Sequence, residues 1–230
     1  MPSLADLRAG DVVACYGTDL VSRCITYLTA WPLAPRGLRL APSHVAVIVP
    51  WDGHNRLAWA ESTTLTGHTC LARGERVKGW QVHRLVDRFD DYLSPGGRID
   101  VYRPHPLHAR RMECGDLSRA AIDYYRELAI EGSAVGYDMR GALWSGTRLL
   151  TRLSPANLNR VFCSEFVAAV LQQVGLLGID HNPAWFNPRR LLAHLGYPDM
   201  RVPISYALHH PERADVPVRT LDLVELGALT

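Results

Sequence analysis

Apolar residues follow two different patterns in the two halves of the chain. In the first half, short apolar runs rich in β-branched residues predict strands. The run from His44 to Val49 is apolar after its first residue, which is typical of a strand buried on both faces. The expected strands cover residues 10–15, 44–49, 56–63, 80–86 and 98–103, with a helix over residues 20–29.

Further along the chain, apolar positions recur at helical spacing. The stretch Cys163 to Val174 carries an apolar stripe at every third or fourth residue, and Gly175 follows it as a stop. Strands in the first half and helices in the second predict an α+β fold. The other helices expected in the second half cover residues 116–131, 139–150 and 187–196.

The chain divides into one expected domain and a tail. Residues 1–200 are expected to form a catalytic domain, and residues 201–230 a proline-containing extension that wraps around it. No apolar run reaches the roughly 18 residues that a membrane span needs, so no integral membrane segment is expected. No signal peptide is visible, which predicts a protein that is cytoplasmic at synthesis and leaves export by a special route open.

Charge and cysteine content exclude several classes of protein. The net charge is only +2, from 25 basic and 23 acidic residues, which argues against a nucleic-acid partner. The five cysteines include no C-x-x-C pair, so neither a zinc cluster nor a disulfide framework is expected. The oligomeric state stays open.

Cys163 differs from the other cysteines because it begins a predicted helix. The first N–H groups of a helix are unpaired and carry the positive end of its dipole. A thiolate at this position would be stabilised and could attack a carbonyl carbon, with the helix N–H groups holding the oxyanion. The alternative is one more buried, unreactive thiol.

His44 and Glu61 are the expected partners of this thiol. His44 starts the apolar strand, a rigid place for a general base, although nine other histidines compete for the role. Glu61 lies on the next strand, where a carboxylate could hold the imidazole with its proton on Nδ1. The alternative for Glu61 is a solvent-facing residue at a sheet edge.

These segments resemble a known family. His44 in SHVAVIV, Glu61 in AWAEST and Cys163 in FCSEFV resemble the permuted papain-like group of the NlpC/P60 superfamily, the YiiX-like cysteine hydrolases related to lecithin retinol acyltransferase. The short pieces Gly10-Asp11-Val12, Gly136-Tyr137-Asp138 and Asn187-Pro188 are also similar to the family pattern.

The resemblance implies a circularly permuted papain-like fold, in which a small antiparallel sheet or half-barrel packs on the helix that carries Cys163. It implies Cys163 as nucleophile, His44 as base and Glu61 as the residue that orients His44. Tyr137 would be an oxyanion donor or substrate contact, or else a buried residue at a helix start. The implied activity is a thiol hydrolase that cleaves an amide or ester bond of a peptide or acyl-lipid substrate, without cofactor or metal.

Several alternatives stay open on the sequence alone. The same triad could serve an acyltransferase, or the fold could be a non-catalytic binding module. Cys163, His44 and a carboxylate could instead hold zinc. The proline-rich loop 31–42 is a candidate lid, and the basic segment 104–114 departs from the family pattern. The aromatics in or near expected loops that could line a cleft are Trp31, Trp51, Trp59, Trp185 and Phe186.

Overall fold

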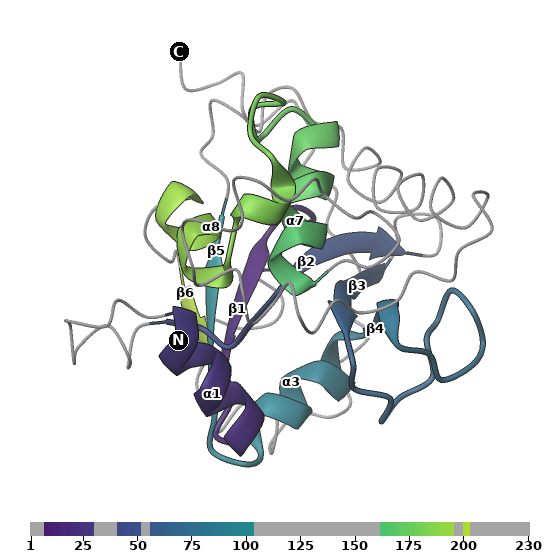
Figure 1. Cartoon of the computed structure of the whole chain (residues 1–230). Helices are drawn as coiled ribbons and strands as arrows, with labels where there is room; N and C mark the ends of the chain where they lie inside the picture. The colour runs from purple at the N-terminus through teal and green to yellow at the C-terminus, as the bar shows by residue number, and fades with distance from the viewer. Residues whose placement is uncertain (1–6, 30–40, 52–55, 104–161, 196–199, 203–230) are drawn as a thin grey trace, which may run out of the picture.

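A computed structural model describes residues 7–29, 41–51, 56–103, 162–195 and 200–202 (Figure 1). Within these ranges, six strands form one sheet in the order β4-β3-β2-β1-β5-β6. Every neighbouring pair is antiparallel. The strands are β1 (Val12–Tyr16), β2 (His44–Trp51), β3 (Arg56–Thr63), β4 (Gly79–Arg84), β5 (Arg98–Tyr102) and β6 (Met200–Val202).

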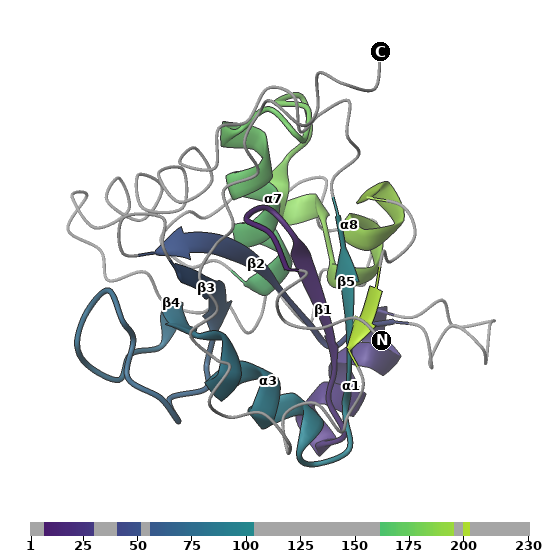
Figure 2. The same ribbon diagram turned by 180° about the vertical axis from the view of Figure 1, so that it is seen from behind.

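Helices cover both faces of this sheet. The long helix α7 packs on β2 and β3 from one side, together with α8, whereas α3 contacts β3, β4 and β5 from the other (Figures 1 and 2). The helices are α1 (Leu20–Thr29), α3 (Leu85–Leu93), α7 (Cys163–Gln173), the short 3-10 helix η2 (Pro183–Trp185) and α8 (Pro188–Leu195).

Strand β2 is continuously apolar because both of its faces are buried. Val45 and Val47 belong to the core on the α7 side, while Ala46 and Ile48 belong to the core on the α3 side. Because successive side chains of a strand point to opposite faces, both faces need apolar residues. Burying one such valine or isoleucine side chain is worth roughly 1.5–3 kcal/mol. His44, the first residue of β2, is therefore attached to one of the most firmly packed strands.

The patterns predicted most elements of the described ranges correctly. The strands expected at residues 44–49 and 56–63 are confirmed as β2 and β3, and the helices expected at 20–29 and 187–196 as α1 and α8. The strand expected over 80–86 is wrong at its end: β4 stops at Arg84 and α3 begins at Leu85. The helices expected over residues 116–131 and 139–150, the candidate lid up to residue 40 and the segment 104–114 lie outside the described residues.

Helix α3 replaces the end of the expected strand because its apolar residues follow helical spacing. Leu85, Phe89 and Tyr92 recur at intervals of four and three residues and are buried against the sheet. The alternation of Trp80 and Val82 in β4 breaks at Arg84, and the apolar Leu85 and Val86 that were expected to continue the strand begin the helix.

Strand β6 lies at the boundary predicted between residues 200 and 201. Met200 pairs with Val101 and Val202 pairs with Ile99, so this short strand adds an edge to the sheet. Residues 203–230 lie outside the described ranges. The division into a domain and an extension therefore stays a prediction.

Candidate active site around Cys163, His44 and Glu61

Strands β2 and β3 place His44 and Glu61 on one face of the sheet. Ala60 pairs with Val47, which puts Glu61 opposite Ala46 and diagonally beside His44. Nε2 of His44 lies 2.6 Å from Oε2 of Glu61, and both side chains are buried. Glu61 is therefore not the solvent-facing edge residue that the sequence left open.

The ring nitrogen that Glu61 contacts differs from the expected one. The sequence pattern predicted a carboxylate beside Nδ1, whereas Oε2 of Glu61 lies beside Nε2. An ionised carboxylate only accepts hydrogen bonds, so Nε2 must carry a proton. This leaves Nδ1 as the ring nitrogen for the thiol of Cys163. The diagonal offset between β2 and β3 determines which ring nitrogen faces Glu61. This offset cannot be deduced from the sequence.

Cys163 reaches His44 from the opposite layer of the fold. It is the first residue of α7 and is buried, with 3% of its surface exposed. Burial lowers the pKa of His44, but the charge and hydrogen bond of Cys163, together with those of Glu61, outweigh burial and raise this pKa to about 9. Ser164, the next residue, donates a hydrogen bond of 2.8 Å to the carbonyl oxygen of Phe186, which fixes the start of α7.

Two further side chains hold the carboxylate of Glu61. Nε1 of Trp59 donates to Oε2 at 2.8 Å, and Nε of Arg88 forms an ion pair with Oε1 at 2.7 Å. Burial alone would raise the pKa of Glu61, but Arg88 and then His44 outweigh it and hold the pKa well below its ordinary range. Glu61 is therefore an anion at neutral pH although it has no exposed surface.

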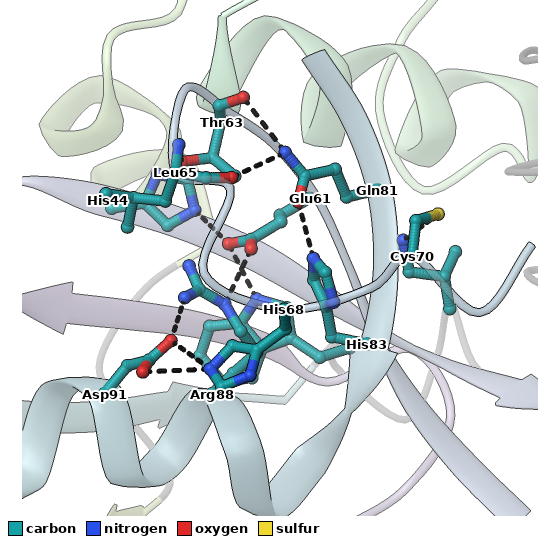
Figure 3. A network of polar contacts seen from close by, with 12 residues as sticks. His44, Glu61, Thr63, Leu65, His68, Cys70, Gln81, His83, Arg88 and Asp91 are labelled. Atoms are coloured by element: carbon teal, nitrogen blue, oxygen red, sulfur yellow. Dashed lines mark hydrogen bonds and ion pairs between the residues drawn. The ribbon is translucent and has the colours of Figure 1, made fainter. Parts of the chain in front are cut away.

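A second polar group lies beside this site (Figure 3). Gln81, opposite Glu61 on β4, donates from Nε2 to the carbonyl oxygens of Leu65 and Val77, and its Oε1 lies 2.6 Å from Nε2 of His83. Burial is the main cause that lowers the pKa of His83. The hydrogen bonds of Gln81 hold β4 in place next to Glu61. Because burial lowers its pKa, His83 is neutral at neutral pH.

Three residues of the site were not predicted from the sequence pattern. No role was expected for Arg88 or Tyr92, and Trp59 was expected only to line a cleft. The ring of Tyr92 stacks on that of His44 with centroids 6.2 Å apart. The spacing of Arg88 and Tyr92, four residues apart on an amphipathic helix, was the available signal. Tyr137 lies outside the described residues.

Two features are absent from the described ranges. Within them, no group of three or more histidine, cysteine, aspartate or glutamate side chains is arranged to hold a metal ion. No helix in these ranges combines the length and the apolar character needed to cross a membrane.

Comparison with known proteins gives a different relationship from the one that the motifs suggested. The family model of the DXP reductoisomerase C-terminal domain matches residues 195–230. Three curated relatives, all named 1-deoxy-D-xylulose 5-phosphate reductoisomerase, come from Ruegeria pomeroyi, Nitrobacter winogradskyi and Chlorobium phaeovibrioides. They are 57%, 32% and 46% identical over 49, 109 and 52 residues.

These matches cover only part of each chain. They involve 21%, 44% and 23% of this chain, in the order given above. The chain in turn spans only 12%, 27% and 14% of the length of these relatives. The matched family segment includes none of Cys163, His44 and Glu61, so it does not test the roles predicted for them.

The comparisons overturn the assignment to the NlpC/P60 superfamily. They find the reductoisomerase C-terminal domain and its relatives instead, so the expected papain-like fold, the thiol hydrolase activity with its alternatives, and the peptide or acyl-lipid substrate are wrong. The resemblance depended on short segments around His44, Glu61 and Cys163. A histidine before a buried strand and a cysteine at a helix start also occur in unrelated folds, because both segments mainly reflect packing.

The observed geometry has a definite chemical capacity. A buried imidazole contacts a carboxylate on one side and a thiol on the other. The carboxylate stabilises the imidazolium that forms when the thiol loses its proton. Such a pair can produce a thiolate in a site from which water is largely excluded.

Proposed function

We propose that the described part of the chain carries a nucleophilic thiol site, in which Cys163 adds reversibly to the carbonyl carbon of a small molecule. The observation that carries this proposal is the environment of His44: its Nε2 lies 2.6 Å from Oε2 of Glu61, and the interaction with Cys163 is, after burial, the largest cause that raises its pKa. The roles of all three residues are part of the proposal.

The addition is balanced and needs no oxidant or reductant. The proton of the Cys163 thiol passes to His44, and the sulfur forms a bond to the carbonyl carbon while the carbonyl π bond breaks. The imidazolium of His44 then gives its proton to the carbonyl oxygen, which yields a hemithioacetal or hemithioketal. N–H groups in the first turn of α7 would stabilise the oxygen as it gains charge.

A small carbonyl compound is the ligand class that agrees best with the comparisons. The relatives that this chain partly matches are named for 1-deoxy-D-xylulose 5-phosphate, which is a ketose. Within the described residues, a site with Cys163 and His44 both buried also favours a small ligand over a polymer.

The first test uses two thiols of the same chain. Iodoacetamide is added at about pH 6, and labelling of Cys163 is compared with labelling of Cys24, which is exposed on α1. The imidazolium of His44 favours a thiolate beside it, so Cys163 should react roughly tenfold faster or more, despite its burial. Faster labelling of Cys24 would contradict the proposal.

The second test detects the adduct itself. A small aldehyde, isotopically labelled at its carbonyl carbon, is added to the full chain and followed by NMR. The resonance of a tetrahedral carbon bonded to sulfur, distinct from that of the hydrate that the aldehyde forms in water, should appear in the wild type and in Cys24→Ser and be missing in Cys163→Ser. An equal signal in all three proteins would overturn the assignment of Cys163.

A reductoisomerase reaction is a second candidate because residues 195–230 match that family. A reductase draws its hydride from a redox cofactor. Dinucleotide-binding folds use parallel strands joined by helices, whereas the strands described here form antiparallel pairs. The described residues do not fit such a cofactor. Oxidation of NADPH by the full chain with 1-deoxy-D-xylulose 5-phosphate would nevertheless favour this candidate.

We also propose that the protein works in a reducing compartment such as the cytoplasm. The four cysteines in the described ranges, Cys15, Cys24, Cys70 and Cys163, are all free thiols. Mass spectrometry of protein isolated with an alkylating agent present should find these thiols reduced. Oxidised Cys163 in freshly isolated protein would contradict this location.

A further inference from the structure

Arg88 is a buried guanidinium whose partner is the carboxylate of the site. Only 2% of its surface is exposed, although it lies on a helix at the outside of the sheet. Its Nε lies 2.7 Å from Oε1 of Glu61, and Nη1 contacts Asp91 (Figure 3). A buried charge without a partner strongly destabilises a folded protein. The burial of Arg88 therefore depends on its ion pair with Glu61.

The two oxygens of Glu61 serve different partners. Oε1 faces Arg88, while Oε2 accepts from both His44 and Trp59. The carboxylate therefore cannot rotate without breaking at least one of these contacts. Arg88 in this way determines which oxygen is presented to His44.

Helix α3 contacts the histidine as well as the carboxylate. Tyr92, one turn after Arg88, stacks on the ring of His44 at an angle of 13°. The guanidinium carbon of Arg88 lies 5.4 Å from the centre of the Tyr92 ring. One helix therefore fixes the plane of the imidazole and the orientation of its acceptor, from the face of the sheet opposite to α7.

The charges of the site balance only when Arg88 is counted. With Cys163 as thiolate, the buried anions are Cys163 and Glu61, and the buried cations are His44 and Arg88. Without Arg88 the group has one surplus negative charge, which burial makes unfavourable. Protonation of Cys163 is the simplest way to remove that surplus.

We propose that Arg88 is a positioning residue of this site, which orients Glu61 and supplies the cation that allows Cys163 and Glu61 to be anions together. The inference depends on the proposed nucleophilic role of Cys163. Arg88 acts through Glu61 and takes no part in proton transfer.

Two other titratable groups near Cys163 stay neutral over the useful pH range. Cys15 on β1 and Tyr92 on α3 interact electrostatically with Cys163, and burial is the main cause that raises the pKa of each. Both are therefore neutral between about pH 6 and 9. Glu165 on α7 accepts from the backbone N–H of Phe162 and lies in the first turn. None of these three groups can replace the charge of Arg88.

The test measures the pH at which alkylation of Cys163 by iodoacetamide reaches half of its maximal rate. Arg88→Met should move this midpoint upward by about one pH unit or more, which lowers the rate at about pH 6 roughly tenfold. Arg88→Lys keeps the charge, so its midpoint should lie close to that of the wild type. The matched control is Arg103→Met, which removes an ion pair with Asp11 next to the ends of β5 and β1 and should leave the midpoint unchanged.

Two more variants keep the test decisive if Arg88→Met does not fold. Glu61→Gln removes the carboxylate that stabilises the imidazolium of His44 and should move the midpoint upward. Because Arg88 acts through Glu61, adding Arg88→Met to Glu61→Gln should leave the midpoint within a few tenths of a unit of that of Glu61→Gln alone. A purely structural Arg88 would change stability and give Arg88→Met the midpoint of the wild type, and this result would overturn the inference.

Failure of this inference can be separated from failure of the proposed function. If Arg88→Met shifts the midpoint but no aldehyde adduct forms in the wild type, the proposed reaction is wrong and the role of Arg88 stands. If the adduct forms at Cys163 and the midpoint of a folded Arg88→Met protein stays within a few tenths of a unit, only the role of Arg88 is wrong.

Discussion

Glu61 remains ionised in a place where a carboxylate is normally excluded. It has no exposed surface, and its stabilisation comes from a guanidinium, an imidazole and an indole N–H. Hydrogen bonds to a charged group are worth about 1.5–3 kcal/mol each, more than those between neutral groups. Each of the three contacts should therefore be measurable by a single substitution.

Trp59→Phe removes one of these contacts and keeps an aromatic ring in the core. The Nε1–H of Trp59, 2.8 Å from Oε2 of Glu61, is lost. We expect the free energy of unfolding to fall by about 1.5–3 kcal/mol, measured by urea denaturation at neutral pH. Trp185→Phe on η2 is the control and should cost clearly less, since its ring is only half buried. Equal losses in both variants would mean that lost packing, and not the hydrogen bond, determines the effect.

The sequence could predict His44 and Glu61 as neighbours but not Arg88. Adjacent strands of a hairpin and a period of two place the histidine and the carboxylate on one face. Arg88 looks like an ordinary exposed arginine in the sequence, because its burial depends on a partner 27 residues earlier in the chain, Glu61. The sequence likewise could not predict that Glu61 contacts Nε2 of His44 and not Nδ1, since this contact depends on the diagonal offset between the two strands.

At the scale of elements, α3 and its connection to β5 determine the position of Arg88 and Tyr92. The helix ends in a tight turn, in which the N–H of Gly97 donates to the carbonyl oxygen of Tyr92 at 2.9 Å. A sequence shows the Gly96-Gly97 pair as a stop signal. It does not show that the second glycine must lie against two backbone carbonyls.

Gly97→Ala should disturb this turn more than Gly96→Ala. A Cβ on Gly97 would lie 2.3 Å from the carbonyl oxygen of Tyr92 and 2.9 Å from that of Tyr16, and backbone atoms yield little. Gly96 has φ of 84° but open space around it, so alanine there meets only backbone strain. We expect losses of about 1–3 kcal/mol for Gly97→Ala and about 1 kcal/mol for Gly96→Ala in thermal unfolding. A larger loss for Gly96→Ala would contradict this view of the turn.

At the scale of the whole molecule, the sheet separates two cores and the candidate site connects them. His44, Glu61 and Trp59 lie on the α3 side, while Cys163 belongs to the core on the α7 side. The contact between Cys163 and His44 therefore forms only when both layers are in place. Since charges in that contact interact more strongly in the folded protein than in the unfolded chain, the stability of the whole fold must depend on pH.

The pH dependence follows from the two shifted groups of the site. The pKa of His44 is raised from 6.5 to about 9, so its stabilising effect is complete below about pH 6.5 and is lost as the pH rises through about 9. The pKa of Glu61 is lowered from 4.5, so its effect is present above about pH 4.5 and is lost as the pH falls further. These two groups together favour the folded state most between about pH 4.5 and 6.5.

His44→Gln should remove the alkaline part of this dependence. We expect the free energy of unfolding of the wild type to fall by up to about 3 kcal/mol between about pH 6 and 9, and that of His44→Gln to change much less. Urea denaturation at both pH values measures the difference. His194→Gln, at an exposed position on α8, is the control and should fall like the wild type. Parallel losses in wild type and His44→Gln would mean that the imidazolium contributes no stability, and that the contacts of His44 with Cys163 and Glu61 do not hold it charged in the folded protein.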